Sequence, residues 1–224
     1  MLYIVPTPIW NKDDITLRAL KLLSSCEVFL CENISTLKKL MNIHDISISD
    51  KRFIVFNSFV DGHKFDRLID MIRKQDVVMC SEAGTPWLSD PAKELVRRYR
   101  EDEIKFEVLP WATALIPAVV SAYHDTSKFV FYGFLPTKKG RQTTLKHIID
   151  NCNDMPYFFY ESVHRIEKLI SELEALWYDG QVYIAREISK LYEQKIVWSI
   201  SEIKEKINSK ELVIKGEFVV WLWR

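Results

Sequence analysis

Residues 77–91, VVMCSEAGTPWLSDP, combine residue types that could hold a small ligand. The apolar start is typical of a β-strand, and Pro91 stands where a following helix could begin. Between them, the short side chains of Ser81, Gly84 and Thr85 would let a ligand contact the main chain. Loops at the carboxyl ends of parallel strands bind ligands in open α/β sheets, because backbone N–H groups and a helix N-terminus converge there. A surface turn without a ligand is the alternative that this stretch alone leaves open.

The composition is that of an ordinary globular protein and excludes several classes of function. Of the 224 residues, 48% are hydrophobic and 28% charged, and Lys plus Arg equals Asp plus Glu at 31 each. Any site for a polyanion must therefore be a local patch. The motifs HExxH, GxxxxGK[ST] and GxGxxG are absent, which argues against a zincin, a P-loop enzyme and a standard dinucleotide-binding fold. Without a signal peptide or an apolar run of membrane length, we expect a cytoplasmic protein.

The cysteines and histidines do not form a metal-binding pattern. Neither CxxC pairs nor nearby histidines accompany the four cysteines, which we interpret as buried free thiols. They are Cys26, Cys31, Cys80 and Cys152. The five histidines are dispersed along the chain, so we expect no metal site.

Strands and helices are predicted to alternate through the first half of the chain. Apolar runs predict strands at residues 2–5, 28–31, 53–56, 77–80 and 105–109. Helices are predicted between them, with Asp13 or Asp14 as the cap of the first and residues 92–100 as the last. A further helix, kinked near Pro117, is predicted within residues 110–123. This alternation favours a mostly parallel sheet covered by helices.

The second half is predicted to be a mixed α/β domain. Strands are predicted at residues 129–132, 157–160, 182–185, 195–199 and 217–223, with helices at 141–150, 163–176 and 201–208. We place the domain boundary near residues 122–127, which gives an N-terminal domain of residues 1–122 and a C-terminal domain of residues 123–224. The groove between two such domains is a natural ligand site.

Eight segments, collinear over nearly the whole chain, together resemble one family. They are YIVPTPIWNKDDITLRAL, FLCEN, CSEAGTPWLSDP, LPWATAL, FVFYGFLPTKKG, FFYESVHR, IAREISKLYE and KGEFVV. They resemble the tetrapyrrole-methylase superfamily, and most closely its branch that 2′-O-methylates a cytidine of small-subunit ribosomal RNA. The resemblance implies a homodimeric methyltransferase that uses S-adenosylmethionine (SAM), has two α/β domains, and binds SAM in the cleft between a mostly parallel N-terminal sheet and a mixed C-terminal sheet.

The resemblance also implies which residues contact SAM. A methyl donor of this kind needs main-chain donors for its carboxylate, an apolar slot for adenine, and acceptors near the sulfonium. The matching positions are Pro8, Ser81, Gly84, Thr85, Pro86, Trp87, Asp90, Thr113, Ala114, Tyr160 and Ala185. For Thr113, Ala114 and Ala185, the alternative is that they only pack within the protein and do not contact SAM.

A catalytic base is expected because a ribose 2′-hydroxyl is a poor nucleophile until it loses its proton. Glu32 occupies a position where the superfamily often carries an acidic residue that faces the substrate, and it is our first candidate. Glu161 and Glu187 also follow predicted strands and could serve instead. Each glutamate could equally be a structural ion-pair partner, with Arg165 and Arg186 available to pair.

A contact with RNA is predicted in the segment FLPTKKGRQ. Lys138, Lys139 and Arg141 follow Pro136 on a predicted loop, and basic residues on such a loop bind phosphates without choosing a sequence. The partner would be small-subunit ribosomal RNA or the assembled 30S subunit. A solvated loop without RNA is the alternative.

Tryptophan stands where the family has glycine in three motifs. They are PTPIWN at Trp10, AGTPWLSDP at Trp87 and PWATA at Trp111. Trp177 and Trp198 also fall where related sequences commonly carry glycine. Glycine makes up only 6 of the 224 residues, under half of the average share of about 7%. An indole at Trp87 or Trp111 could fill the SAM site.

We hypothesise that a difference in decoding produced these tryptophans. Some bacterial lineages read the codon UGA as glycine, and translation under a code that reads UGA as tryptophan would give this pattern. The question extends to Trp221 and Trp223, and UGG codons at the motif positions would refute the idea. The alternative is a divergent member of the family with a reshaped or closed cleft.

Two rival functions remain open at the level of the sequence. One is a tetrapyrrole C-methyltransferase, which shares the chemistry but acts on a porphyrin precursor. The other is a non-catalytic RNA- or ribosome-binding protein whose SAM cleft is blocked. Asn33 and Ser35, where the ribosomal-RNA branch usually carries aspartate and arginine, weaken the substrate assignment more than the chemistry.

Overall fold

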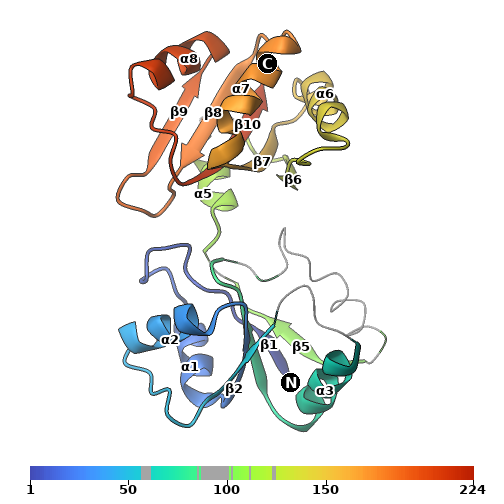
Figure 1. Cartoon of the computed structure of the whole chain (residues 1–224), viewed down its shortest axis with the longest axis vertical. Helices are drawn as coiled ribbons and strands as arrows, with labels where there is room; N and C mark the ends of the chain where they lie inside the picture. Colours follow the sequence, from blue (N-terminus) through green and yellow to red (C-terminus); the bar gives the residue numbers. More distant parts are fainter. Residues whose placement is uncertain (57–61, 85, 87–100, 102, 111, 123–124) are drawn as a thin grey trace. The chain divides into compact units, whose positions relative to one another are not determined.

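The chain forms two α/β units (Figure 1). The computed structural model describes residues 1–56, 62–84, 86, 101, 103–110, 112–122 and 125–224. Its backbone contacts divide the chain into Met1–Thr113 and Ala114–Arg224. Within the described residues, no helix is long and apolar enough to cross a membrane.

The first unit is built on a parallel five-stranded sheet. Its strands are β1 (Leu2–Ile4), β2 (Val28–Cys31), β3 (Arg52–Val55), β4 (Val77–Cys80) and β5 (Phe106–Val108). Their order is β3-β2-β4-β1-β5, and every neighbouring pair is parallel. This confirms the prediction of a parallel N-terminal sheet. The carboxyl ends of β1, β2 and β4 therefore meet at one edge.

Helices cover both faces of this sheet. Successive residues along a strand point to opposite faces of the sheet. On one face, Leu30 and Met79 pack against α3 (Gly62–Lys74). On the other, Phe29 and Val78 pack against α1 (Leu17–Ser25) and α2 (Ile34–Ile43). The central strands β2 and β4 are buried on both faces and are continuous apolar runs.

Two helix boundaries differ from the prediction. The cap of α1 is Thr16, whose hydroxyl accepts the backbone N–H of Ala19, so neither Asp13 nor Asp14 caps it. Helix α5 (Leu115–Val120) is shorter than predicted, and Pro117 lies in its first turn, where a missing N–H costs no intrahelical bond. The helix predicted at residues 92–100 lies outside the described residues.

The second unit is built on a mixed sheet, as predicted. Its strands are β6 (Val130–Phe134), β7 (Tyr157–Ser162), β8 (Gln181–Arg186), β9 (Gln194–Trp198) and β10 (Glu217–Trp223). Their order is β6-β7-β10-β8-β9; β6 and β7 are parallel and the other pairs antiparallel. One face packs against α6 (Arg141–Asn151), α7 (Ile166–Ala175) and α8 (Ile200–Asn208). A short 3₁₀ helix, η1 (Val163–Arg165), precedes α7.

Two tryptophans occupy backbone conformations that favour glycine. Trp10 has φ of 112° and Trp177 has φ of 55°. Trp177 follows the end of α7, where its N–H donates to the carbonyl of Glu174 and the next N–H, of Tyr178, donates to Leu173. These two bonds form a Schellman motif, whose left-handed position is usually glycine. The structure thus agrees with glycine at these two positions, whereas Trp198, Trp221 and Trp223 lie in strands.

Trp177→Gly is expected to raise the free energy of unfolding by about 1 kcal/mol, because glycine removes the steric penalty of a Cβ in the left-handed region. The indole contributes little packing, since Trp177 is 88% exposed. Urea unfolding measures the change. Trp177→Ala is the matched control, because it removes the indole but keeps the Cβ. An equal gain from the alanine variant would contradict this explanation.

The four cysteines are free and buried, as predicted. Burial raises the pKa of each thiol above its ordinary value, for Cys31 to about 11. The neutral thiol is the favoured form, so the resulting stabilisation is complete below the ordinary pKa of 9.0 and is lost as the pH rises toward 11. At about pH 8 we expect the native protein to react slowly with a thiol reagent and the urea-unfolded chain to react at all four cysteines. Rapid labelling of the native protein would contradict this expectation.

Candidate functional site

The carboxyl edge of the first sheet joins two segments that the sequence analysis assigned to SAM. Thr7 and Gly84 exchange backbone hydrogen bonds of 3.2 and 3.0 Å. The hydroxyl of Thr7 donates to the carbonyl of Ser81 at 3.2 Å, and the hydroxyl of Ser81 donates to that of Gly84 at 2.7 Å. These bonds hold the turn before Pro8 against the loop that follows β4.

Gly84 is required by the backbone at this edge. Its φ is 73°, and an added Cβ would lie 3.3 Å from a methyl carbon of Ile9. Apart from Glu82, the described loop of residues 81–84 consists of short side chains, which would let a ligand approach the main chain closely. Pro8 and Pro86 are buried beside it. Thr85, Trp87 and Asp90 lie outside the described residues, as does Trp111.

Glu32 lies at the same edge as this loop. The register pairs Cys31 of β2 with Cys80 of β4, so Glu32 and Ser81 follow neighbouring strand ends. Glu32 is exposed. This placement would let its carboxylate face a substrate beside the loop after β4.

Glu82 is a second carboxylate at this edge that the sequence analysis missed. Its Oε1 accepts hydrogen bonds from the side chains of Asn33 at 3.3 Å and Thr36 at 3.2 Å. Asn33 in turn caps α2 by accepting the N–H groups of Ser35 and Thr36. Asn33 is therefore a structural residue here, and it links the loops after β2 and β4.

Two further SAM candidates lie in one row of the second sheet. Val219 of β10 pairs with Tyr160 on β7 and with Ala185 on β8. Tyr160 and Ala185 therefore flank Val219 on the same face of the sheet. Ala185 is buried and Tyr160 is partly exposed, with its ring 5.4 Å from that of Phe134. Thr113 and Ala114 are partly buried and lie where the two units divide.

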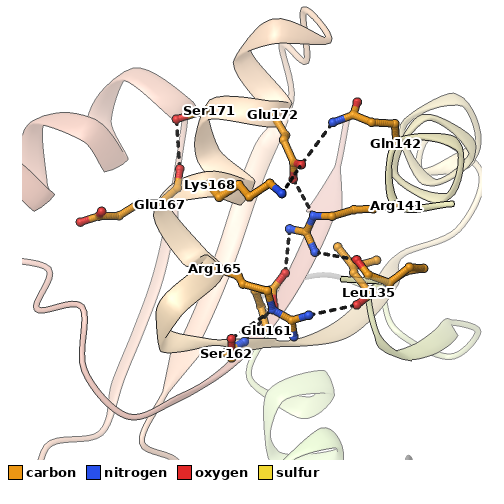
Figure 2. Close-up of polar contacts among 11 residues, drawn as sticks. Leu135, Arg141, Gln142, Glu161, Ser162, Arg165, Glu167, Lys168, Ser171 and Glu172 are labelled. Carbon is orange, nitrogen blue, oxygen red and sulfur yellow. Dashed lines mark hydrogen bonds and ion pairs between the residues drawn. The ribbon is translucent and has the colours of Figure 1, made fainter. Parts of the chain in front are cut away.

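Four charged side chains of the second unit form a buried group, the charge cluster, made of Arg141, Glu161, Arg165 and Glu172. Figure 2 shows Arg141 of α6 between Glu161, near the end of β7, and Glu172 of α7. Arg141 lies 2.9 Å from Glu161 and 2.8 Å from Glu172, and Arg165 lies 2.7 Å from the other oxygen of Glu161. Arg141 is 2% exposed and Glu161 is 1% exposed. The two positive and two negative charges balance.

The charge cluster corrects the role predicted for Arg141. Burial lowers the pKa of its guanidinium, but hydrogen bonds to Glu172 and Glu161 outweigh burial, so the pKa is raised overall and the charge is kept. A side chain enclosed in this way cannot reach RNA. Arg141 is the first residue of α6, as predicted, but its pairing with Glu161 and Glu172 turns the side chain inward, whereas the exposed Lys138 and Lys139 precede the helix.

The alternative bases are both held by other side chains. In Glu161, one carboxylate oxygen faces Arg141 and the other faces Arg165, the partner that the sequence analysis offered. Glu187 accepts the ammonium of Lys190 at 2.7 Å and the N–H of Glu217 at 3.1 Å. Arg186 donates to Gln194 at 2.8 Å and to the carbonyl of Lys215 at 3.1 Å. Both carboxylate oxygens of Glu161 and one of Glu187 are therefore already in contact with a charged side chain.

Glu172 is the member of the charge cluster that the sequence analysis did not single out. It lies on the face of α7 that also carries Leu169 and Leu173, and this face packs on the sheet. A glutamate three residues after a buried leucine was the available signal, because such positions share a helix face.

Comparison with known proteins agrees with this architecture. The model of the tetrapyrrole (corrin/porphyrin) methylases matches residues 1–204. Curated relatives named ribosomal RNA small subunit methyltransferase I include one from Helicobacter pylori strain 26695 (33% identical, 99% of this chain, 82% of the relative) and one from Hydrogenobaculum (34%, 99% and 94%). One from Mycoplasma genitalium is 30% identical, over 98% of this chain and 78% of the relative.

Solved structures of lower identity share the fold. A cobalt precorrin-4 methyltransferase aligns with a TM-score of 0.69 and 14% identity over 99% of this chain and 94% of its own. The uroporphyrin III C-methyltransferase of Thermus thermophilus aligns with a TM-score of 0.65 and 15% identity over 100% and 97%. With the family model and the curated relatives, they confirm the resemblance and the two-domain α/β fold: the chain belongs to the tetrapyrrole (corrin/porphyrin) methylase family, in the branch of the relatives named ribosomal RNA small subunit methyltransferase I.

Proposed function

We propose that this SAM-dependent methyltransferase acts on the 2′-hydroxyl of a cytidine in small-subunit ribosomal RNA. Relatives of at least 30% identity over nearly the whole chain carry the name ribosomal RNA small subunit methyltransferase I, which supports the RNA substrate. Such a substrate would place the reaction in the cytoplasm, on free RNA or on the assembled subunit. The homodimer implied by the resemblance stays a prediction.

The observation that carries the chemistry is the exposed Glu32 at the strand end beside the Ser81–Gly84 loop. SAM, when bound, supplies an electrophilic methyl group. Glu32 would accept the proton of the 2′-hydroxyl while the ribose oxygen forms a bond to that methyl group and displaces the thioether sulfur. Glu161 and Glu187 are less suited to this role, because arginine and lysine neutralise them.

The proposed cofactor contacts remain those of the sequence analysis. The described part of the first unit offers the main chain and short side chains around Pro8, Ser81, Gly84 and Pro86 for the amino-acid end of SAM. In the second unit, Tyr160 and Ala185 flank Val219 on one face of the sheet. The ring of Tyr160 and the small Ala185 would suit an apolar group such as adenine.

RNA contact is proposed for the exposed Lys138 and Lys139 of the segment before α6. Within the part of the chain that the structure describes, neither lysine pairs with a carboxylate. Both ammonium groups are thus available to phosphates, which bind lysine independently of base sequence.

The test is to identify the methylated product when the protein is offered each of two alternative acceptors. Undermethylated small ribosomal subunits and a porphyrin precursor are incubated separately with the protein and SAM carrying labelled methyl. We expect label only in the ribosomal RNA, released as 2′-O-methylcytidine after digestion to nucleosides. Label in the porphyrin precursor would establish the tetrapyrrole C-methyltransferase, and RNA binding without SAM binding would favour the non-catalytic protein.

A further inference from the structure

The segment that carries the two exposed lysines is tied to the charge cluster. We call residues 135–140, which join β6 to α6, the basic loop. Arg165 donates to the carbonyl of Leu135 at 3.4 Å, and Arg141 donates through its side chain to the carbonyl of Pro136 at 3.3 Å (Figure 2). The backbone N–H of Arg141 also donates to the carbonyl of Lys138 at 3.3 Å. Two arginines thus hold three carbonyl groups of one short loop.

The arginines are themselves held in place by their carboxylate partners. Arg141 uses separate nitrogens for Glu161, Glu172 and Pro136, which only the planar fork of a guanidinium can do. Arg165 uses Nε for Glu161 and for the hydroxyl of Ser162, and Nη1 for Leu135. Because the partners come from β7 and α7, the loop is anchored to the folded core of the unit.

Stability alone does not explain a buried cluster of this kind. Replacing a buried ion pair by apolar side chains is often neutral or stabilising, because the charges lose their hydration. An apolar core at this place, however, could not donate to the carbonyls of Leu135 and Pro136. The positive charges therefore have a specific consequence, which is to fix the path of the basic loop.

A fixed path matters for Lys138 and Lys139. Both are exposed, and Gly140, with φ of 87°, ends the loop directly before α6. Ordering a flexible loop on binding costs affinity, and a loop that is already ordered avoids this cost. Building on the proposed function, we propose that Arg141 and Arg165 are positioning residues: they act through the basic loop to hold Lys138 and Lys139 for the phosphodiester backbone of the RNA substrate.

The test compares how variants change the affinity for RNA and its dependence on salt. Binding of a fluorescent small-subunit ribosomal RNA fragment is measured at several salt concentrations, with SAM binding as the check on folding. Lys138→Ala/Lys139→Ala is expected to weaken binding and to make the salt slope shallower by about 1.5, because two phosphate contacts are lost. Lys210→Ala/Lys215→Ala is the control: it removes the same charge from exposed positions after α8 and is expected to leave the affinity within about twofold.

Arg165→Lys is expected to weaken RNA binding about tenfold with an unchanged salt slope, because the lysines still make their contacts but the loop must be ordered first. Arg141→Lys is expected to act in the same way. Arg165 is 19% exposed, so its variant is the safer one if the more deeply buried Arg141 does not tolerate change. In the Lys138→Ala/Lys139→Ala background, Arg165→Lys should have no further effect, since the residues through which it acts are gone.

Three results would overturn the inference. Unchanged RNA affinity of folded Arg165→Lys would show that the loop does not need its anchor. A shallower salt slope for this variant would show that Arg165 binds phosphate itself. Equal effects of Arg165→Lys with and without the two lysines would show that it acts elsewhere. If the unmodified protein does not bind the RNA at all, the proposed function fails together with the inference, whereas the three results above leave it standing.

Discussion

Replacing Glu161 by alanine is expected to lower the free energy of unfolding by about 3–5 kcal/mol. Both of its carboxylate oxygens face guanidinium groups, and its side chain is fully buried. Removing the carboxylate would leave Arg141 with one partner and Arg165 with none from the charge cluster. A buried positive charge that loses its partner destabilises the fold far more than an exposed positive charge that loses its partner.

Urea unfolding of the isolated protein measures this change. Glu174→Ala is the matched control, because Glu174 also pairs with a basic residue, Lys204 at 2.8 Å, but both side chains are exposed. The control should cost less than about 1 kcal/mol. Similar losses from the two variants would contradict the view that burial makes the charge cluster important.

Replacing Glu32 by glutamine is expected to lower kcat for RNA methylation by about 10²–10⁴-fold, the usual contribution of a general base. Glutamine keeps the size of the side chain but cannot accept the proton of the 2′-hydroxyl. Multiple-turnover transfer of labelled methyl to saturating small ribosomal subunits measures the effect. SAM binding should change little, because the carboxylate is proposed to act on the substrate.

Glu82→Gln provides the control at the same edge of the sheet. Glu82 is exposed and close to Asn33, and glutamine keeps the carbonyl oxygen that accepts the bonds from Asn33 and Thr36. We expect a change of less than about tenfold in kcat. A loss as large as that of Glu32→Gln would move the role of base to Glu82, and unchanged activity of Glu32→Gln would reject Glu32 as the base.

The sheets could be predicted from the sequence because their strands are bounded apolar runs. Val28–Cys31 and Val77–Cys80 are buried at every position, so their limits are visible in the chain. The start of the first helix could not be decided in the same way, since Asp13, Asp14 and Thr16 are all good caps. Only the folded backbone shows that the hydroxyl of Thr16 reaches Ala19.

The site was predictable in part, for a similar reason. Motifs place Glu32 and Ser81 after strands, but it is the register of β2 against β4 that makes them neighbours. The burial of Arg141 depends on Glu172, which lies 31 positions away in the chain, and no local pattern contains that pairing. The tryptophans show the opposite case: the motifs suggested glycine, and the positive φ of Trp10 and Trp177 then agreed with it.

Transfer of labelled methyl from SAM to undermethylated small ribosomal subunits tests the central claim most directly. The unchanged chain should be compared with a form that carries glycine at Trp10, Trp87, Trp111 and Trp177, where the motifs or a positive φ favour glycine. We predict that the glycine form methylates the ribosomal RNA, and equal activity of the unchanged chain would show that the indoles are accommodated. A glycine form that folds and binds SAM but transfers no methyl group to the subunit would contradict the assignment.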